Sequence, residues 1–296
     1  MTALPSLFIS HGSPMTALEP GLAGPFLQRL GPAIEACFGR PRAILAISAH
    51  TLTREPVLLG AAQHATVHDF SGFPPALYQL RYDSAGAPDL MPRVAALVRA
   101  AGLPVRETTD GGLDHGIWSP LRFAWPLANV PILPLGFPPD WSPARLFALG
   151  RALAPLTDAG AGAGAGVLVM GSGSITHNLG LVFGAGRPAL DAPEIATSAA
   201  FRGWFAQRAA AADWPALLAY RTRAPHAALM HPTDEHLLPF FVAAGTASTA
   251  PTGLRLHDSI TYGCLGMDNY AFGPSAAELG AALDGVFTPA PISAAA

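Results

Sequence analysis

The chain has 296 residues, of which 50% are hydrophobic and 12% charged, with a net charge of −3 and a pI near 6.3. This length suits one large α/β domain, or two small ones, with room for a substantial core. All basic residues are arginines and none form a run, so no nucleic-acid partner is expected. Cys37 and Cys264 are too few and too far apart for a disulfide framework or a cysteine-based zinc site.

No apolar stretch approaches the roughly 18 residues that a membrane helix needs. The N-terminal sequence MTALPSLFIS lacks the basic region of a secretory signal. We therefore expect a soluble, cytoplasmic protein with no membrane partner.

The N-terminal part of the chain alternates short apolar runs with helical patterns. Residues 6–10 and 43–48 predict strands. Between them, residues 26–38 have spacing compatible with a helix, although Gly31 and Pro32 interrupt it. Farther along, residues 88–102 predict a helix that ends at Gly102, ahead of Pro104.

The later part continues the same alternation. Residues 131–137 form a third apolar run, whose prolines suggest a sheet edge or an irregular strand. Residues 167–170 form a fourth. A long helical region is predicted over roughly 193–221, and a further helix near Thr233, whose side chain could cap it.

Strands that alternate with helices predict an α/β fold. We expect a single catalytic domain over residues 1–287, with a central, mostly parallel or mixed sheet flanked by helices. The AGAGAGAG segment that ends at Gly166 predicts a flexible loop, and residues 288–296 a disordered tail.

The stretch VLVMGSGSITHN, residues 167–178, allows two interpretations. A strand followed by G-x-G begins a dinucleotide site, which would indicate a nucleotide-binding oxidoreductase. However, Thr176 stands where that motif needs a third glycine or alanine. The alternative is a turn that presents His177 at a strand end.

Histidines follow three of the predicted strands. His11, His50 and His177 each come just after one, where ligands and catalytic groups of parallel sheets gather. His115 lies in a glycine-flanked loop, and His231 precedes the helix expected near Thr233. Each of these histidines alone could be structural, but their shared setting favours one site at the carboxyl ends of the strands.

Convergent neutral imidazoles suit a divalent metal such as Fe(II) or Zn(II). Asp234 or Glu235 could add a carboxylate ligand, or could simply be acidic residues of a first helical turn.

Six segments together resemble the class III extradiol ring-cleaving dioxygenases, particularly the DOPA dioxygenase-like branch. In chain order they are FISHGSP, ISAHT, DHGIWSPL, GSGSITHNL, HPTDEHLLPFF and YGCLGMDNYAF, and they span nearly the whole chain. Thr51, in place of a usual tryptophan, and Ser174, in place of a frequent asparagine, are expected to line the pocket and to affect the choice of substrate.

The resemblance implies one non-haem divalent metal per chain, with His11, His50 and His231 as ligands. His177 would be a fourth ligand or a catalytic acid/base, and His115 would contact the substrate or move its protons. Four residues are predicted to contact the substrate: Ser13, Ser174, Trp118 and His236. Phe73 and Tyr262 are further possible pocket walls.

The predicted reaction inserts both atoms of dioxygen into a catechol, DOPA-like or related, to give a muconic semialdehyde. Fe(II) is expected for turnover, with Zn(II) possible as the bound species. The protein could be a monomer or a homo-oligomer. Two alternatives remain open: a zinc-dependent hydrolase with Glu235 or His115 as general base, and a non-catalytic protein that binds metal or catechol on the same fold.

Overall fold

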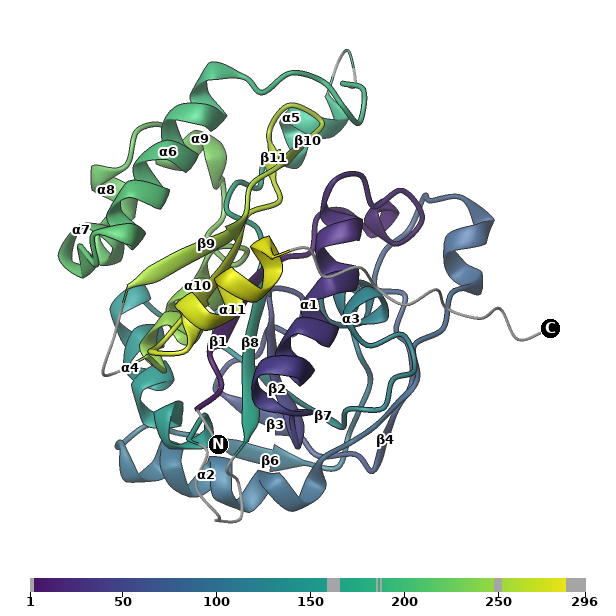
Figure 1. Ribbon diagram of the computed structural model, residues 1–296, viewed down its shortest axis with the longest axis vertical. Coiled ribbons are helices and arrows are strands. Elements are labelled where there is room, and N and C mark those ends of the chain that lie inside the picture. Colours follow the sequence, from purple (N-terminus) through teal and green to yellow (C-terminus); the bar gives the residue numbers. More distant parts are fainter. Residues whose placement is uncertain (1–2, 159–165, 185, 187, 248–251, 286–296) are drawn as a thin grey trace.

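One mixed sheet of eight strands organises the protein, in a computed structural model that describes residues 3–158, 166–184, 186, 188–247 and 252–285 (Figure 1). Its strand order is β6-β3-β7-β2-β8-β1-β12-β9. In chain order, these strands are β1 (Ser6–Ser10), β2 (Ala43–Ser48), β3 (Val57–Leu59), β6 (Arg106–Thr108), β7 (Ile132–Gly136), β8 (Val167–Gly173), β9 (Gly253–His257) and β12 (Asn269–Phe272). Two short ribbons pair β4 (Gln63–His64) with β5 (Ser84–Ala85) and β10 (Ile260–Thr261) with β11 (Leu265–Gly266).

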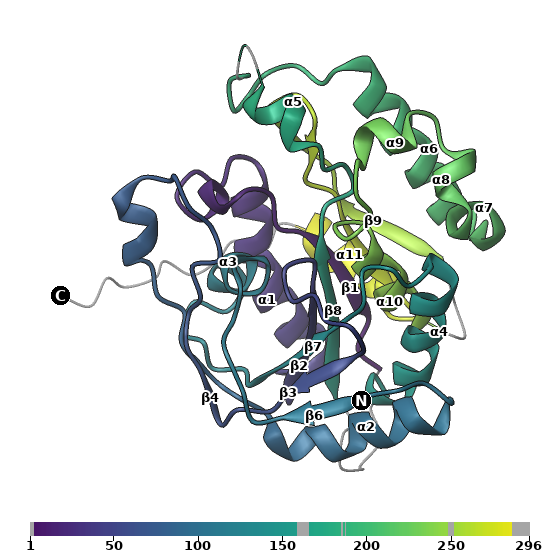
Figure 2. The same ribbon diagram turned by 180° about the vertical axis from the view of Figure 1, so that it is seen from behind.

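Helices cover both faces of this sheet (Figures 1 and 2). They are α1 (Ala23–Phe38), α2 (Met91–Ala100), α3 (His115–Ala124), α4 (Pro143–Leu153), α5 (Leu179–Phe183), α6 (Ala196–Ala210), α7 (Trp214–Leu218), α8 (Tyr220–Arg223), α9 (Ala227–Met230), α10 (Leu238–Gly245) and α11 (Ala276–Asp284). The predicted α/β architecture with a mixed central sheet is confirmed.

The strands at the centre of the sheet are buried on both faces. Neighbouring strands β7, β2, β8 and β1 run parallel. Alternate residues of β1 enter different cores: Phe8 packs with α4 and α10, whereas Leu7 and Ile9 pack with α1, α3 and α11. Burial on both sides explains why these strands read as continuous apolar runs.

Helix α1 continues through Gly31 and Pro32, which the sequence suggested as an interruption. Gly31 is needed where α1 crosses α3, because a Cβ there would lie 1.9 Å from the carbonyl oxygen of Ala124. The predicted helix over 88–102 is confirmed as α2, preceded by a 3-10 turn at Pro88–Leu90.

The prediction that residues 131–137 form a sheet edge is wrong. Strand β7 lies inside the sheet, parallel to β2 and antiparallel to β3. Its pairing with β3 involves Leu135 and Gly136 but not Pro134. Proline is therefore tolerated here, since the N–H group it lacks is not used in that ladder.

The long helix predicted over 193–221 is three shorter helices, α6, α7 and α8. The break falls at Ala212, whose φ of 51° is left-handed, and Asp213 then caps α7 by accepting from the N–H of Ala216. The helix expected near Thr233 begins instead at Leu238, and the Thr233 hydroxyl donates to Glu235.

Two predicted segments lie outside the described residues: AGAGAGAG, except for its final Gly166, and the tail over 288–296. Cys37 and Cys264 are both free thiols. Within the described ranges, no helix has the length and apolar character needed to cross a membrane.

Candidate metal centre and active-site cavity

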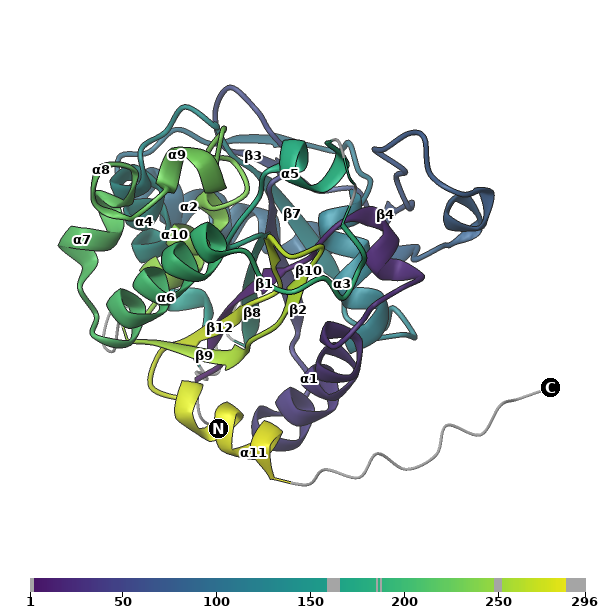
Figure 3. The same ribbon diagram turned by 90° about the horizontal axis from the view of Figure 1, so that it is seen from above.

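A cavity of about 950 Å³ opens at the carboxyl ends of the central strands. The view from above shows α5 and the β10–β11 ribbon lying over this end of the sheet (Figure 3). Aromatic and apolar side chains form much of the cavity wall: Met15, Phe70, Phe73, Leu179, Phe183, Tyr262 and Leu265. Four histidines also line it: His50, His115, His177 and His236.

Three imidazoles meet at the base of this cavity. Nε2 of His50 lies 3.1 Å from Nε2 of His11 and 3.3 Å from Nε2 of His236. His11 follows β1, His50 follows β2, and His236 precedes α10, which packs against β8 and β1. The sheet therefore brings together residues from the two ends of the chain.

Neighbouring groups fix which nitrogen of each ring carries the proton. Ser172 donates its only hydroxyl proton to the carbonyl of Gly116 at 2.5 Å, so its oxygen must accept from Nδ1–H of His11 at 2.9 Å. Nδ1 of His236 faces Glu235 at 2.9 Å, and Nδ1 of His50 faces Asp69 at 3.4 Å. Because the serine oxygen accepts here and a carboxylate only accepts, the Nε2 atoms of His11 and His236 carry lone pairs, and the nearby Asp69 favours the same tautomer of His50.

Burial keeps these rings neutral. Burial and the neighbouring His50 lower the pKa of His11 well below its usual value, and burial and His177 do the same for His236. Burial, followed by His115, lowers the pKa of His50 to about 3. Neutral imidazole is the form that binds a metal ion.

This donor set fits a divalent metal ion. The Nε2 lone pair of His50 lies 3.1 and 3.3 Å from those of His11 and His236, and such close lone pairs repel one another unless a cation lies between them. Each Nδ1 has an acceptor that orients the ring, as is usual for metal-binding histidines. Three imidazoles also leave coordination positions for other ligands, which suits a catalytic rather than a purely structural metal.

A histidine–carboxylate pair lies next to these rings. Asp69 accepts from both the backbone N–H of His115 (2.8 Å) and its Nδ1 (2.9 Å), which leaves Nε2 of His115 as a proton acceptor. Burial opposes ionisation of Asp69, but its contacts with His115 outweigh burial and lower its pKa. The ring centroids of His115 and His50 are 4.0 Å apart, so this pair adjoins the three-histidine cluster.

His177 occupies another side of the cluster. Its ring stacks on His236, with centroids 3.4 Å apart and planes 8° from parallel. Burial, followed by His231, lowers the pKa of His177 to about 4. A neutral imidazole here can accept or donate a proton beside the metal position.

Comparison with known proteins identifies this constellation. Residues 5–273 match the family described as the catalytic LigB subunit of aromatic ring-opening dioxygenase. The chain belongs to the LigB family of class III extradiol dioxygenases. It is 35% identical over 269 residues to a 4,5-DOPA dioxygenase extradiol of Beta vulgaris, a match that covers 90% of this chain and 96% of the relative.

Further similarities agree with this assignment. A 4,5-DOPA dioxygenase extradiol of Mirabilis jalapa is 32% identical over 275 residues, covering 90% of this chain and 96% of that protein. The crystal structure of an uncharacterized protein from Escherichia coli K12 superposes with a TM-score of 0.71 at 27% identity, covering 91% of this chain and all of that one. The predicted family resemblance is confirmed, and this chain is an extradiol ring-opening dioxygenase of a family that depends on a non-haem metal.

Of the three predicted ligands, the structure brings His11 and His50 together and places His231 apart from them. His231 is fully buried and donates from Nε2 to the carbonyl of Ile175 at 2.8 Å, while its Nδ1 has no hydrogen-bond partner among the described residues. It packs against Phe201 and belongs to none of the potential metal-binding groups in the described chain. His236, predicted as a substrate contact, takes its place beside His11 and His50.

Two predicted substrate contacts also lie away from the LigB cavity. Trp118 is buried in the core and donates to the carbonyl of Val67 at 2.9 Å. Ser174 is buried, with its hydroxyl 2.7 Å from the carbonyl of Thr176. Neither side chain is among the residues that line the cavity. Ser13 does border the cavity, as do the proposed walls Phe73 and Tyr262.

Asp69 and Asp114 support the histidine cluster through hydrogen bonds, and the sequence reasoning missed both. Asp114 accepts from Ser48 at 2.7 Å and from Thr51 at 2.5 Å, and it caps α3, whose first residue is His115. It thus fixes the turn that carries His50 relative to His115. Thr51, expected to line the pocket, serves this contact instead. The sequence signal that could have identified Asp114 is its position directly before His115, where an aspartate can cap the helix that follows.

The glycines of GSGSITHN serve neither phosphate binding nor a turn, because Gly171 and Gly173 both lie within β8. A Cβ at Gly173 would lie 1.9 Å from the carbonyl oxygen of His236, and one at Gly171 would lie 2.3 Å from that of Pro239. The backbone N–H of Ser174 donates to the same His236 carbonyl at 2.8 Å. These glycines let the segment that carries His236 pack directly on the strand.

Substitution Gly173→Ala is therefore expected to displace His236 and to weaken metal binding by about 10- to 100-fold, since supporting contacts of metal ligands have effects of this size. Metal content after dialysis, with Kd from competition against a chelator, would check this. Gly203→Ala is the matched control, because nothing lies within 4 Å of a Cβ at that position on α6. Equal metal affinity in both variants would contradict the proposed packing role.

Proposed function

We propose that this LigB-family enzyme cleaves the ring of a catechol-type substrate, DOPA-like or related, to give a muconic semialdehyde. The observation that carries the proposal is the set of three Nε2 lone pairs at the base of an aromatic-walled cavity, next to the His115–Asp69 pair. Similarity to the 4,5-DOPA dioxygenases supports a substrate of that class.

His11, His50 and His236 are the proposed metal ligands, with Fe(II) for turnover and Zn(II) as a possible bound species. A metal held by these residues would supply Lewis acidity toward the catechol and the redox activity that reaction with dioxygen requires. Because the three imidazoles are neutral, the site keeps the full +2 charge of the ion, which favours an anionic catecholate over a neutral phenol.

His115 is the proposed general base. Asp69 holds its Nδ1–H, so Nε2 can take a proton from a catechol hydroxyl and the resulting imidazolium is stabilised by the carboxylate. His177 is the proposed second acid/base group, because it lines the same cavity and stacks on His236. A histidine on each side can move protons at both substrate oxygens.

The cavity wall also limits the substituent on the catechol ring. Phe70 and Phe73 can pack against an aromatic ring. The described lining includes the carboxylates Asp69 and Glu19 but no arginine. Substituents that are neutral or that carry an amine, as DOPA does, are therefore favoured over a substituent with a carboxylate alone.

Dioxygen uptake by metal-free protein reconstituted anaerobically with Fe(II) or Zn(II) tests the proposal. We expect uptake and a yellow product with Fe(II) and a catechol, and none with Zn(II), because ring cleavage needs a redox-active metal. DOPA and dopamine should be better substrates than 3,4-dihydroxybenzoate. No uptake with any catechol, alongside tight zinc binding, would refute the proposed reaction for this chain.

A further inference from the structure

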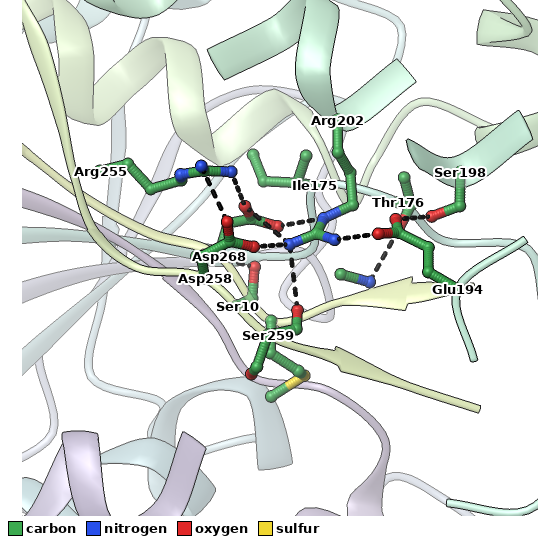
Figure 4. A network of polar contacts seen from close by, with 12 residues as sticks. Ser10, Ile175, Thr176, Glu194, Ser198, Arg202, Arg255, Asp258, Ser259 and Asp268 are labelled. Atoms are coloured by element: carbon green, nitrogen blue, oxygen red, sulfur yellow. Dashed lines mark hydrogen bonds and ion pairs between the residues drawn. The ribbon is translucent and has the colours of Figure 1, made fainter. Parts of the chain in front are cut away.

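A second polar cluster lies behind one wall of the cavity, centred on the buried side chain of Arg202 (Figure 4). Its guanidinium binds Asp268 through two nitrogens, at 2.7 and 3.1 Å. It also donates to Glu194 at 2.9 Å, to Asp258, and to the carbonyl of Ser259 at 3.2 Å. Three carboxylates around one buried arginine make a rigid, geometrically specific junction.

Apart from Glu194, the partners of Arg202 flank the two ends of the β10–β11 ribbon. Asp258 and Ser259 come just before β10, and Asp268 comes just after β11. Arg255 reinforces the same junction, contacting Asp258 at 2.8 Å and Asp268 at 3.2 Å. Arg202, on α6, thus fixes the base of the ribbon from both sides.

The tip of the ribbon is held by the same region. Glu194 precedes Ile195, whose N–H donates to the carbonyl of Gly263 at 2.9 Å. The N–H of Tyr262 donates to the carbonyl of Leu190, also at 2.9 Å. Because Glu194 is itself bound to Arg202, the base and the tip of the ribbon are anchored by one connected set of contacts.

The tip consists of three residues, Tyr262 to Cys264, between the paired Thr261 and Leu265. The N–H of Cys264 donates to the carbonyl of Thr261 at 3.3 Å, which makes Tyr262 and Gly263 the two central residues of the turn. Their φ angles are 52° and 64°, as in the type I′ turns of tight hairpins. Asparagine, aspartate and glycine are the usual residues at the first of these positions, and a tyrosine there is conformationally strained. The strained residue borders the cavity, together with Leu265 of the same ribbon.

We infer that Tyr262 selects substrates by limiting the bulk of the ring substituent, and that Arg202 is the positioning residue that holds its ribbon against the cavity. A large aromatic side chain in a strained backbone position is retained where the surrounding contacts fix it. This inference rests on the proposed function, since it takes the cavity to be the catechol site.

Catechol, 4-methylcatechol and 4-tert-butylcatechol test the role of Tyr262 without any change in substrate charge. Tyr262→Asn keeps a residue that accepts the left-handed backbone but removes the ring, whereas Tyr262→Phe keeps the ring. We expect Tyr262→Asn to raise the ratio of kcat/KM for 4-tert-butylcatechol to that for catechol by about tenfold or more, mainly through KM. Tyr262→Phe should leave this ratio unchanged. An unchanged ratio in Tyr262→Asn would overturn the role of Tyr262.

The role of Arg202 is tested in the same assay. Arg202→Lys, which cannot bind Asp268 through two nitrogens, should shift the ratio in the same direction, with kcat for catechol and metal content nearly unchanged. The double variant Arg202→Lys/Tyr262→Asn should match Tyr262→Asn alone, because the arginine acts through the tyrosine. If the two substitutions changed the kcat/KM ratio independently, so that their effects multiplied in the double variant, the positioning role of Arg202 would be overturned.

Two further measurements keep the test decisive. If Arg202→Lys does not fold, Glu194→Gln, which removes only the charge of one of the three carboxylates bound to Arg202, should shift the ratio in the same direction. In zinc-loaded protein, the variants should also bind 4-tert-butylcatechol more tightly relative to catechol, as measured by Kd, and this readout does not depend on turnover. If the catechols bind but the ratio of their Kd values is the same in the variants as in the wild type, only this inference is refuted. If no catechol binds, the proposed function is refuted as well.

Discussion

His236→Ala is expected to leave the protein without tightly bound metal and to reduce turnover by on the order of 10³-fold or more, because a catalytic metal supplies several kcal/mol of stabilisation. Its Nε2 is one of the three converging lone pairs, and its Nδ1 is already held by Glu235. Metal content by emission spectroscopy and dioxygen uptake with Fe(II) would measure the two effects.

His231→Gln is the matched control for this experiment, since His231 comes from the same HPTDEH segment but donates to Ile175 rather than to the cluster. It is expected to keep its metal while losing about 1–3 kcal/mol of unfolding free energy, the usual cost of disturbing a buried hydrogen bond. If His231→Gln lost the metal and His236→Ala retained it, the assignment of the third ligand would be reversed.

His115→Gln is expected to lower kcat by about 10²- to 10⁴-fold, the range found for loss of a general acid or base. Glutamine can still donate to Asp69, but it has no ring nitrogen that could accept a proton from a catechol. Metal content should stay at the wild-type level, because the proposed ligands are His11, His50 and His236. Single-turnover absorbance measurements on Fe(II)-loaded protein would follow the step directly.

Glu19→Gln is the control for a polar substitution elsewhere in the cavity wall, because Glu19 lines the same cavity but is not bonded to the His115–Asp69 pair. It should retain wild-type kcat for plain catechol. Loss of metal in His115→Gln would point to the alternative grouping of His50, Asp69 and His115 as the binding site.

The sequence was informative where parallel strands decide the geometry. His11 and His50 could be placed together because β1 and β2 both run parallel to β8, and parallel strands end at the same edge. His177 could be placed near them for the same reason. The alternation of apolar strands and helices was equally sufficient for the α/β class.

The choice between His231 and His236 could not be made in this way. Both lie in the connection between α9 and α10, where no helical or strand periodicity says which side chain faces the sheet. The contact that decides it is the packing of the His236 carbonyl on Gly173, more than 60 residues away in sequence. Asp69 was missed for a related reason, because its loop has no regular structure and only the fold brings it to His115.

The wide spacing of the proposed ligands ties metal loading to folding. His50 is 39 residues from His11 and 186 from His236, so no local segment can hold the ion and the unfolded chain has no comparable site. Because only the native state binds the ion, the free energy of metal binding adds to the free energy of folding. The ion would link the ends of β1 and β2 to the segment that precedes α10, and its binding would report that the slowest, longest-range contacts have already formed.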